Sequence, residues 1–375
     1  MGKIPVDING MGPRFCVLGA GHGGMAMAGH LGLMGYEVNL YNRSAERIDP
    51  IRLTGGIELS GVVEGFGRIN LATADIEEAL DGVDILMVVV PANGHRFIAE
   101  KVAPFLRDGQ IVLLNPGRTG GALEVHSVFR EMKVKADIIV GEAQTLLYAS
   151  RNINPAQVQI FGLKNTIPVA ALPGQKTVEL VKALRAVYPQ FIPGDNVLKT
   201  SLNNIGAVFH PALTVLNAAR IESTRGEFQF YMEGITPSVA NVLEAVDEER
   251  VAVAAALGIR GMSAREWLYM AYDAPGRTLY EAIQNNPGYK GINAPAIVDH
   301  RYLWEDVPMS LVPIASLGEH LEVPTLTIEN IIHMASLLNK IDYWGMGRTV
   351  EKMGLAGLTV AQIRHLALEG ELSSV

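Results

Sequence analysis

The sequence is poor in cysteine, in charge and in long hydrophobic runs, and each shortage argues against a class of protein. Its single cysteine, Cys16, cannot form an internal disulfide, as expected in a reducing compartment. No apolar run approaches the roughly 18 residues that span a membrane, and the amino-terminal segment lacks an apolar core of signal-peptide length. We therefore expect a cytoplasmic protein without a membrane segment.

The charge balance is acidic rather than basic. Asp and Glu number 39 against 31 Lys and Arg, which gives a formal net charge of −8, and no basic block occurs. A chain of this kind is a poor partner for nucleic acid or for an anionic membrane surface. The histidines are scattered and form no zinc-ligand pattern with the lone cysteine, so we expect no metal site.

Glycine, by contrast, is abundant, at 39 of 375 residues in a chain that is 49% hydrophobic. At about 100–200 residues per domain, this length predicts two domains. In the first half, short apolar runs alternate with helical patterns, which is typical of parallel strands buried on both faces. The expected strands cover residues 14–18, 37–41, 84–90, 110–114, 137–140 and 170–172. The pattern predicts an α/β domain with a doubly wound, Rossmann-type sheet over residues 1–192.

The second half of the sequence has a different pattern, in which long stretches of helical periodicity dominate. They cover residues 198–221, 238–257, 263–271, 326–338 and 360–368. Pro189, Pro193 and Gly194 interrupt the pattern between the halves. We therefore expect a mostly α-helical domain over residues 193–375 that binds substrate and carries the catalytic groups. Its apolar surface suits a homodimer contact, although the sequence leaves the oligomeric state open.

Residues 19–24 read Gly-Ala-Gly-His-Gly-Gly, which fits the G-x-G-x-x-G pattern of a dinucleotide-binding loop. The segment directly follows the first expected strand and opens a helical pattern, as that pattern requires. Glycines permit the sharp turn and the close approach of a pyrophosphate to the helix N-terminus. We expect Gly19, Gly21, His22 and Gly24 to contact a nicotinamide dinucleotide, with a purely structural role as the alternative for His22.

The segment after the second expected strand distinguishes NADP from NAD. NAD sites usually carry a carboxylate there, whereas an arginine accommodates the 2′-phosphate of NADP. This sequence has Asn42, Arg43 and Ser44 at that point. A cation and a hydroxyl suit a phosphate, so NADP is the expected cofactor and NAD the alternative. Pro91 follows the strand expected at residues 84–90, and it either faces the nicotinamide or belongs to an ordinary turn.

Two strings in the second half combine groups that exchange protons or bind anions. The first, N-N-I-G-A-V-F-H-P-A, contains Asn203 and His210. A histidine followed by proline in a helical run predicts a kink beside a titratable group. The second string, D-H-R-Y-L-W-E-D-V-P, contains Arg301 and Asp306.

Together with the glycine loop, V-V-V-P-A-N and G-E-A-Q-T-L-L-Y-A-S-R, these strings resemble the opine dehydrogenase family, which includes octopine and nopaline dehydrogenases. The resemblance covers nearly the whole chain, and H-R-Y-L-W-E-D-V-P is its most specific part. It implies an NAD(P)H-dependent reductive condensation, in which an amino acid amine and a 2-oxo acid such as pyruvate form an imine that is then reduced.

The residue chemistry suits such a reaction. Imine formation and reduction need a group that exchanges protons near neutral pH, a role that we expect of His210. A carboxylate on the second ring nitrogen fixes the tautomer, and the family spacing selects Asp306 over Asp299 and Glu305. The substrates carry carboxylates, for which a buried guanidinium is a suitable anchor, the role expected of Arg301. Further substrate contacts are expected from Thr145 and Asn203.

Two other functions are compatible with parts of the pattern. Lys199 and Asn203 stand four residues apart, which places them on one face of a helix. Such a pair is similar to one in dehydropantoate reductase and glycerol-3-phosphate dehydrogenase relatives, so the first alternative is an NADP-dependent 2-oxo acid or ketone reductase that works through Lys199. The second is a non-catalytic NADP-binding regulatory protein, because a fold does not fix a function.

Overall fold

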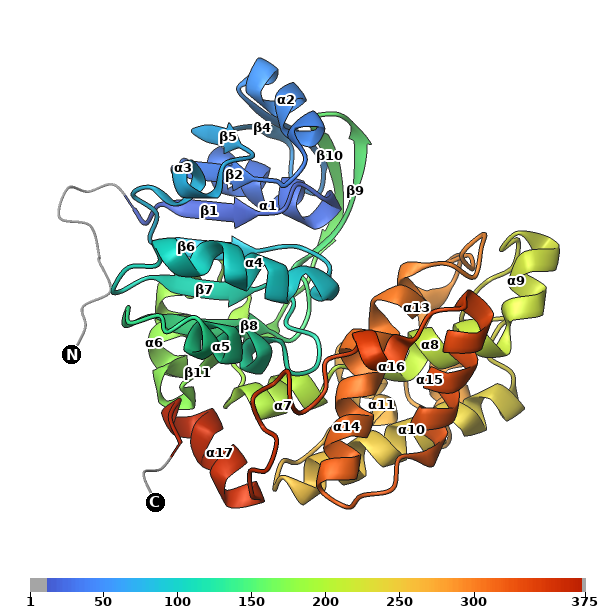
Figure 1. Cartoon of the computed structure of the whole chain (residues 1–375). Helices are drawn as coiled ribbons and strands as arrows, with labels where there is room; N and C mark the ends of the chain where they lie inside the picture. Colours follow the sequence, from blue (N-terminus) through green and yellow to red (C-terminus); the bar gives the residue numbers. More distant parts are fainter. Residues whose placement is uncertain (1–11, 373–375) are drawn as a thin grey trace. The chain divides into compact units, whose positions relative to one another are not determined.

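The computed structural model describes residues 12–372, which divide into two units (Figure 1). The first unit contains residues 12–200 and 365–372, and the second contains residues 201–364. The end of the last helix, α17 (Val360–Glu369), thus belongs to the first unit. The predicted ranges 1–192 and 193–375 did not contain this return of the chain.

The first unit is built on an eight-stranded sheet with the order β12–β11–β8–β7–β6–β1–β2–β5. The strands are β1 (Phe15–Leu18), β2 (Val38–Tyr41), β5 (Leu71–Thr73), β6 (Ile85–Val88), β7 (Ile111–Leu114), β8 (Ile139–Ala143), β11 (Ile167–Leu172) and β12 (Phe191–Pro193). From β5 to β8 all neighbours are parallel, in the strand order 3-2-1-4-5-6 of dinucleotide-binding folds. Among the described residues of this sheet, the one antiparallel pair is β8 with β11. The Rossmann-type prediction is confirmed.

A second sheet of four strands was not predicted from the sequence. Its order is β4–β3–β10–β9, and its strands are β3 (Gly56–Gly61), β4 (Gly65–Arg68), β9 (Tyr148–Asn154) and β10 (Gln157–Leu163). Helix α1 (His22–Leu33) contacts all four strands and also β1 and β2, so it lies between the two sheets (Figure 1). The backbones approach closely, because a Cβ atom on Gly67 would lie 1.9 Å from the carbonyl oxygen of Gly29.

The helices of the first unit connect the strands of the larger sheet. They are α2 (Ala45–Thr54), α3 (Ile76–Leu80), α4 (His95–Val102), α5 (Gly121–Glu131), α6 (Thr177–Arg185) and α7 (Val197–Leu202), the last of which ends across the boundary between the units. At the chain end, Leu366 and Ala367 of α17 are buried. The Glu369 carboxylate accepts a hydrogen bond from Gln175, which follows β11. A Cβ atom on Gly174, between β11 and α6, would lie 3.0 Å from the Ala367 carbonyl oxygen of α17, which is drawn in red in Figure 1.

The second unit is a helical assembly, as predicted. Its helices are α8 (Gly206–Leu216), α9 (Ala218–Thr224), α10 (Pro237–Ala256), α11 (Ala264–Tyr272), α12 (Leu279–Gln284), α13 (Arg301–Trp304), α14 (Val312–His320), α15 (Leu326–Asn339) and α16 (Tyr343–Met346), with a π-helical turn η5 (Val307–Leu311). The buried helix α8 contacts α10, α13 and α15. It continues past Pro211 to Leu216, so the proline does not end the helix. No helix among residues 12–372 is long and apolar enough to cross a membrane.

Candidate active site

The glycine loop joins β1 to α1 and has the geometry of a pyrophosphate cradle. Gly19 has a φ of +119°, and a Cβ atom on Gly24 would lie 1.8 Å from the Gly19 carbonyl oxygen, so this turn requires both glycines. A Cβ atom on Gly21 would meet nothing within 4 Å, which leaves open space at the mouth of the loop. Gly21 is the N-cap residue of α1, and no side chain caps this end of the helix. The N–H groups of the first helical turn are therefore suitable donors to an anion.

The end of β2 presents a cation and a hydroxyl beside this loop. Asn42 accepts a hydrogen bond from the Ala20 amide at 3.1 Å, and its Nδ2 donates to the Ser44 carbonyl at 3.1 Å. Asn42 therefore orders the loop. Arg43 is exposed, with its guanidinium carbon 5.6 Å from the centroid of the Phe97 ring. The hydroxyl of Ser44 does not cap α2.

Two further residues expected near the cofactor have identifiable structural contacts. The Nδ1 atom of His22 accepts a hydrogen bond from the Asn152 amide at 2.9 Å, and the His22 carbonyl accepts one from Ser150 at 3.1 Å. His22 thus links α1 to β9, which favours the structural alternative for its ring. Pro91 is exposed at the carboxyl end of β6, where its carbonyl accepts the Gly94 amide at 2.8 Å in a turn.

Thr145 follows β8 and has a cationic neighbour that the sequence did not indicate. Its hydroxyl accepts a hydrogen bond from the ammonium group of Lys164, in the segment between β10 and β11. Desolvation of Lys164 and the charge of nearby Arg118 lower the pKa of this lysine to about 8. No motif marks Lys164, because only the antiparallel pairing of β8 with β11 brings it to the carboxyl end of β8.

In the second unit, His210 and Asp306 form a hydrogen-bonded pair across 96 residues of sequence. His210 lies on α8, and its Nδ1 atom is 2.8 Å from Oδ2 of Asp306, which follows α13. The Asp306 side chain is fully buried, whereas that of His210 is 22% exposed. A carboxylate is an acceptor, so Nδ1 donates and carries a proton. The Nε2 atom is then the nitrogen that accepts a proton in the neutral ring.

Arg301 is paired but not buried, so the expectation of a buried guanidinium is wrong. Its Nη2 atom lies 2.7 Å from Oε2 of Glu305, and its side chain is 51% exposed, against 3% for Glu305. Arg301 is the first residue of the four-residue helix α13. The guanidinium has five N–H donors, so the ion pair does not exhaust its capacity to bind a carboxylate.

Asn203 directly follows α7, which ends at Leu202 and contains Lys199. Asn203 is buried, and its Oδ1 atom accepts the Met262 amide at 2.9 Å. Arg250 of α10 donates to the Met262 carbonyl at 2.5 Å, so this segment is held from two sides. Lys199 forms an ion pair with Asp195 on the surface of the first unit. The Oδ1 atom of Asn203 thus holds the segment that contains Met262, and the Lys199 of the ketone reductase alternative is paired with Asp195.

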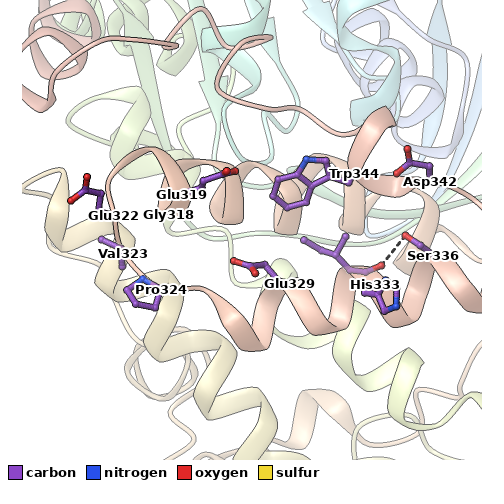
Figure 2. Close-up of a pocket in the computed structure, with 11 residues that line it drawn as sticks. Gly318, Glu319, Glu322, Val323, Pro324, Glu329, His333, Ser336, Asp342 and Trp344 are labelled. Atoms are coloured by element: carbon purple, nitrogen blue, oxygen red, sulfur yellow. Dashed lines mark hydrogen bonds between the residues drawn. The ribbon is translucent and has the colours of Figure 1, made fainter.

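A hollow of about 690 Å³ lies in the second unit between α14, α15 and α16, and Figure 2 shows residues that line it. The side chains around it include Glu319, Glu322, Glu329, Asp342 and Trp344. Four carboxylates repel an oxo acid and a dinucleotide, which are themselves anions. His210 is not among the lining residues, so we assign this hollow no part in the reaction. Within residues 12–372, no cluster of three or more acidic, His or Cys side chains is placed to hold a metal ion.

A Rossmann-type unit with an open glycine loop and a helical unit with a His–Asp pair define the class of nicotinamide-dependent dehydrogenases. Residues 193–339 match the family model of the NAD/NADP octopine/nopaline dehydrogenase alpha-helical domain, and residues 14–117 match that of the NAD-dependent glycerol-3-phosphate dehydrogenase N-terminus. The chain is 41% identical to the opine dehydrogenase of Arthrobacter sp. (strain 1C), over 93% of this chain and 97% of that relative. The chain belongs to the opine dehydrogenase family.

Solved structures share the fold at lower identity. An octopine dehydrogenase in complex with NADH and agmatine superposes with a TM-score of 0.79 at 22% identity, over 96% of this chain and 98% of that one. An NADP⁺-bound yersinopine dehydrogenase gives a TM-score of 0.73 at 16% identity, with the same coverage. The resemblance inferred from the sequence strings is confirmed. The chain is an NAD(P)-dependent oxidoreductase that acts on CH–NH bonds and catalyses the reductive condensation typical of opine dehydrogenases.

Proposed function

We propose that His210 moves the protons in the condensation of an amino acid with a 2-oxo acid, and that Asp306 orients its ring. The observation that carries this proposal is the 2.8 Å contact between the partly exposed imidazole and the buried carboxylate. With Nδ1–H held by Asp306, Nε2 takes a proton from the amino acid ammonium group and frees the amine. The Asp306 charge stabilises the resulting imidazolium.

The freed amine attacks the carbonyl carbon of the oxo acid, and the carbinolamine loses its hydroxyl as water to form a protonated imine (an iminium ion). The imidazolium of His210 returns its proton to the departing hydroxyl, so the histidine ends this step neutral. The nicotinamide cofactor, when bound, would supply the hydride that reduces the iminium carbon and leaves a secondary amine. One C–N bond and one C–H bond form, and one water leaves.

The substrate carboxylates need cationic or hydroxyl partners, and each unit has candidates. Arg301 supplies an exposed guanidinium whose position is fixed by Glu305, and Thr145 supplies a hydroxyl beside Lys164. Other octopine dehydrogenase structures contain L-arginine or pyruvate together with NADH. These pairs support an amino acid and a small 2-oxo acid, such as pyruvate, as the substrates of this chain. Asn203 is left out of the substrate contacts because its side chain is buried against Met262.

NADPH is the cofactor that we propose. Residues 42–44 contain no carboxylate for a ribose 2′-OH, whereas Arg43 is exposed and the Ser44 hydroxyl caps no helix. A guanidinium and a hydroxyl are suitable partners for a 2′-phosphate. Gly19, Gly21 and Gly24 would hold the pyrophosphate.

Product analysis tests this function. The purified chain is incubated with pyruvate, a panel of L-amino acids and NADPH that carries deuterium at the transferred hydride position. The products are identified by mass spectrometry. The expected product has the mass of the amino acid plus the oxo acid, less water and plus one hydrogen and one deuterium. Deuterated lactate in place of this product would support a ketone reductase instead.

A further inference from the structure

The ring of His210 is held by more than Asp306. It stacks on the ring of Tyr302, with centroids 4.2 Å apart and an angle of 22° between the planes. Tyr302 also stacks on Phe230, at 5.3 Å and 15°, and Phe230 is fully buried. His300 meets Tyr302 edge-on, at 4.5 Å and 77°. The imidazole therefore has a carboxylate at one edge and an aromatic ring on one face.

We propose that Tyr302 is a positioning residue for His210, whose stacked ring keeps Nδ1 on Asp306 and Nε2 at a fixed direction during proton exchange. This inference rests on the proposed function of His210. The torsion that turns an imidazole about its Cβ–Cγ bond is broad, so a single hydrogen bond leaves the ring free to rock. A stacked ring opposes that motion, and proton transfer is sensitive to misplacement of about 1 Å.

The spacing of residues in the D-H-R-Y-L-W-E-D-V-P string explains how one short helical segment contacts His210 through both Tyr302 and Asp306. Tyr302 and Asp306 are four residues apart, as are Arg301 and Glu305, and residues with this spacing lie on one side of a helix. The turn continues past Trp304, because the Glu305 amide donates to the Arg301 carbonyl at 3.0 Å. One side of the turn therefore holds His210, and the neighbouring side carries the guanidinium–carboxylate pair.

The π-helical turn that follows supports a functional reading of this segment. Turns of this type are rare, and they occur often at functional sites. Residues Val307–Leu311 form the turn directly after Asp306, and Ser310 accepts a hydrogen bond from Asn204 at 2.9 Å. Asn204 precedes α8, the helix that carries His210. This hydrogen bond therefore connects the segment before His210 with the turn that follows Asp306.

The test compares Tyr302→Leu with Tyr302→Phe. We expect the leucine variant to lose about 10-fold to 100-fold in kcat, with KM for both substrates and NADPH affinity within about threefold of the parent. The phenylalanine variant keeps the ring and should retain kcat within about threefold. Tyr302→Met fills a similar volume without a ring, and it replaces the leucine variant if that chain does not fold. Tyr269→Leu, at an exposed tyrosine on α11, is the matched control.

A double-variant cycle distinguishes positioning from a general structural role. In the His210→Ala background, Tyr302→Leu should have almost no further effect on kcat, because the ring it positions is absent. Full kcat in Tyr302→Leu, or an equal loss with and without His210, would overturn the inference. If His210→Ala itself left kcat unchanged, the proposed function would fail instead, so the two failures are distinguishable.

Discussion

At the scale of single residues, His210 is the side chain whose loss has the most direct chemical consequence. We expect His210→Ala to lower kcat by about 10²–10⁴, the usual contribution of a general acid–base group. The fold should persist, because the side chain is partly exposed. Lys199→Ala is the control and should leave kcat unchanged, since this lysine pairs with Asp195 on the surface. If steady-state kinetics instead showed a large loss of kcat in Lys199→Ala and none in His210→Ala, Lys199 rather than His210 would be the acid–base group.

Arg43 determines the choice of cofactor in the proposal. We expect Arg43→Ala to weaken NADPH binding by about tenfold or more, and NADH binding much less, because only NADPH carries the 2′-phosphate. Fluorescence titration with both cofactors measures the ratio. Arg185→Ala, at an exposed position on α6, should change neither affinity. An equal loss for both cofactors in Arg43→Ala would remove the phosphate role.

At the scale of elements, the contact between α1 and β4 depends on glycine. Gly67→Ala places a Cβ atom against the Gly29 backbone, and we expect a loss of about 1–3 kcal/mol in the free energy of unfolding. Gly162→Ala in β10 is the control, because its Cβ atom would meet nothing within 4 Å. Denaturant titrations of the two variants give the comparison. Equal stability would show that the packing of α1 on β4 tolerates a methyl group.

The same contact explains which elements could be predicted from the sequence. Strands such as β6 and β7 are buried on both faces, so each reads as a continuous apolar run. Strand β4 is Gly-Phe-Gly-Arg and mostly exposed, and its pairing with β3 and its packing on α1, rather than an apolar pattern, make it a strand. The helix expected at residues 198–221 is three helices, because helical periodicity does not show where a buried chain turns.

The candidate site shows a similar limit. The 2.8 Å contact of His210 with Asp306 spans 96 residues, and only the family spacing singled out Asp306. The Arg301 side chain is 51% exposed, and neither its residue type nor its place in the string indicates this. Lys164 and Tyr302 were not identified because neither residue type, taken alone, indicates a contact with Thr145 or His210.

At the scale of the whole molecule, an acidic chain with a net charge of −8 must bind anionic substrates through local cations. The first unit carries Arg43 and Lys164 at the carboxyl ends of its strands, and the second carries Arg301. Selection of oxo acids therefore depends on a few side chains rather than on the overall field.

The return of the chain to the first unit also has a measurable consequence. His126 on α5 hydrogen-bonds the backbone of Gly370, and burial, with a smaller effect of Arg130, lowers its pKa to about 4 from the ordinary 6.5. The unfolded chain thus binds the proton more readily, so stability falls as pH drops from about 6.5 toward 4. Thermal unfolding of His126→Gln should show a smaller decline over this window. His333→Gln, at an exposed position, should keep the parent slope.

The most direct test of the central claim is the initial rate of NADPH oxidation with pyruvate and an L-amino acid, supplied singly and together. Reductive condensation predicts oxidation only when both substrates are present, and a loss of that rate in His210→Ala. Oxidation with pyruvate alone, unchanged when the amino acid is added, would contradict the account.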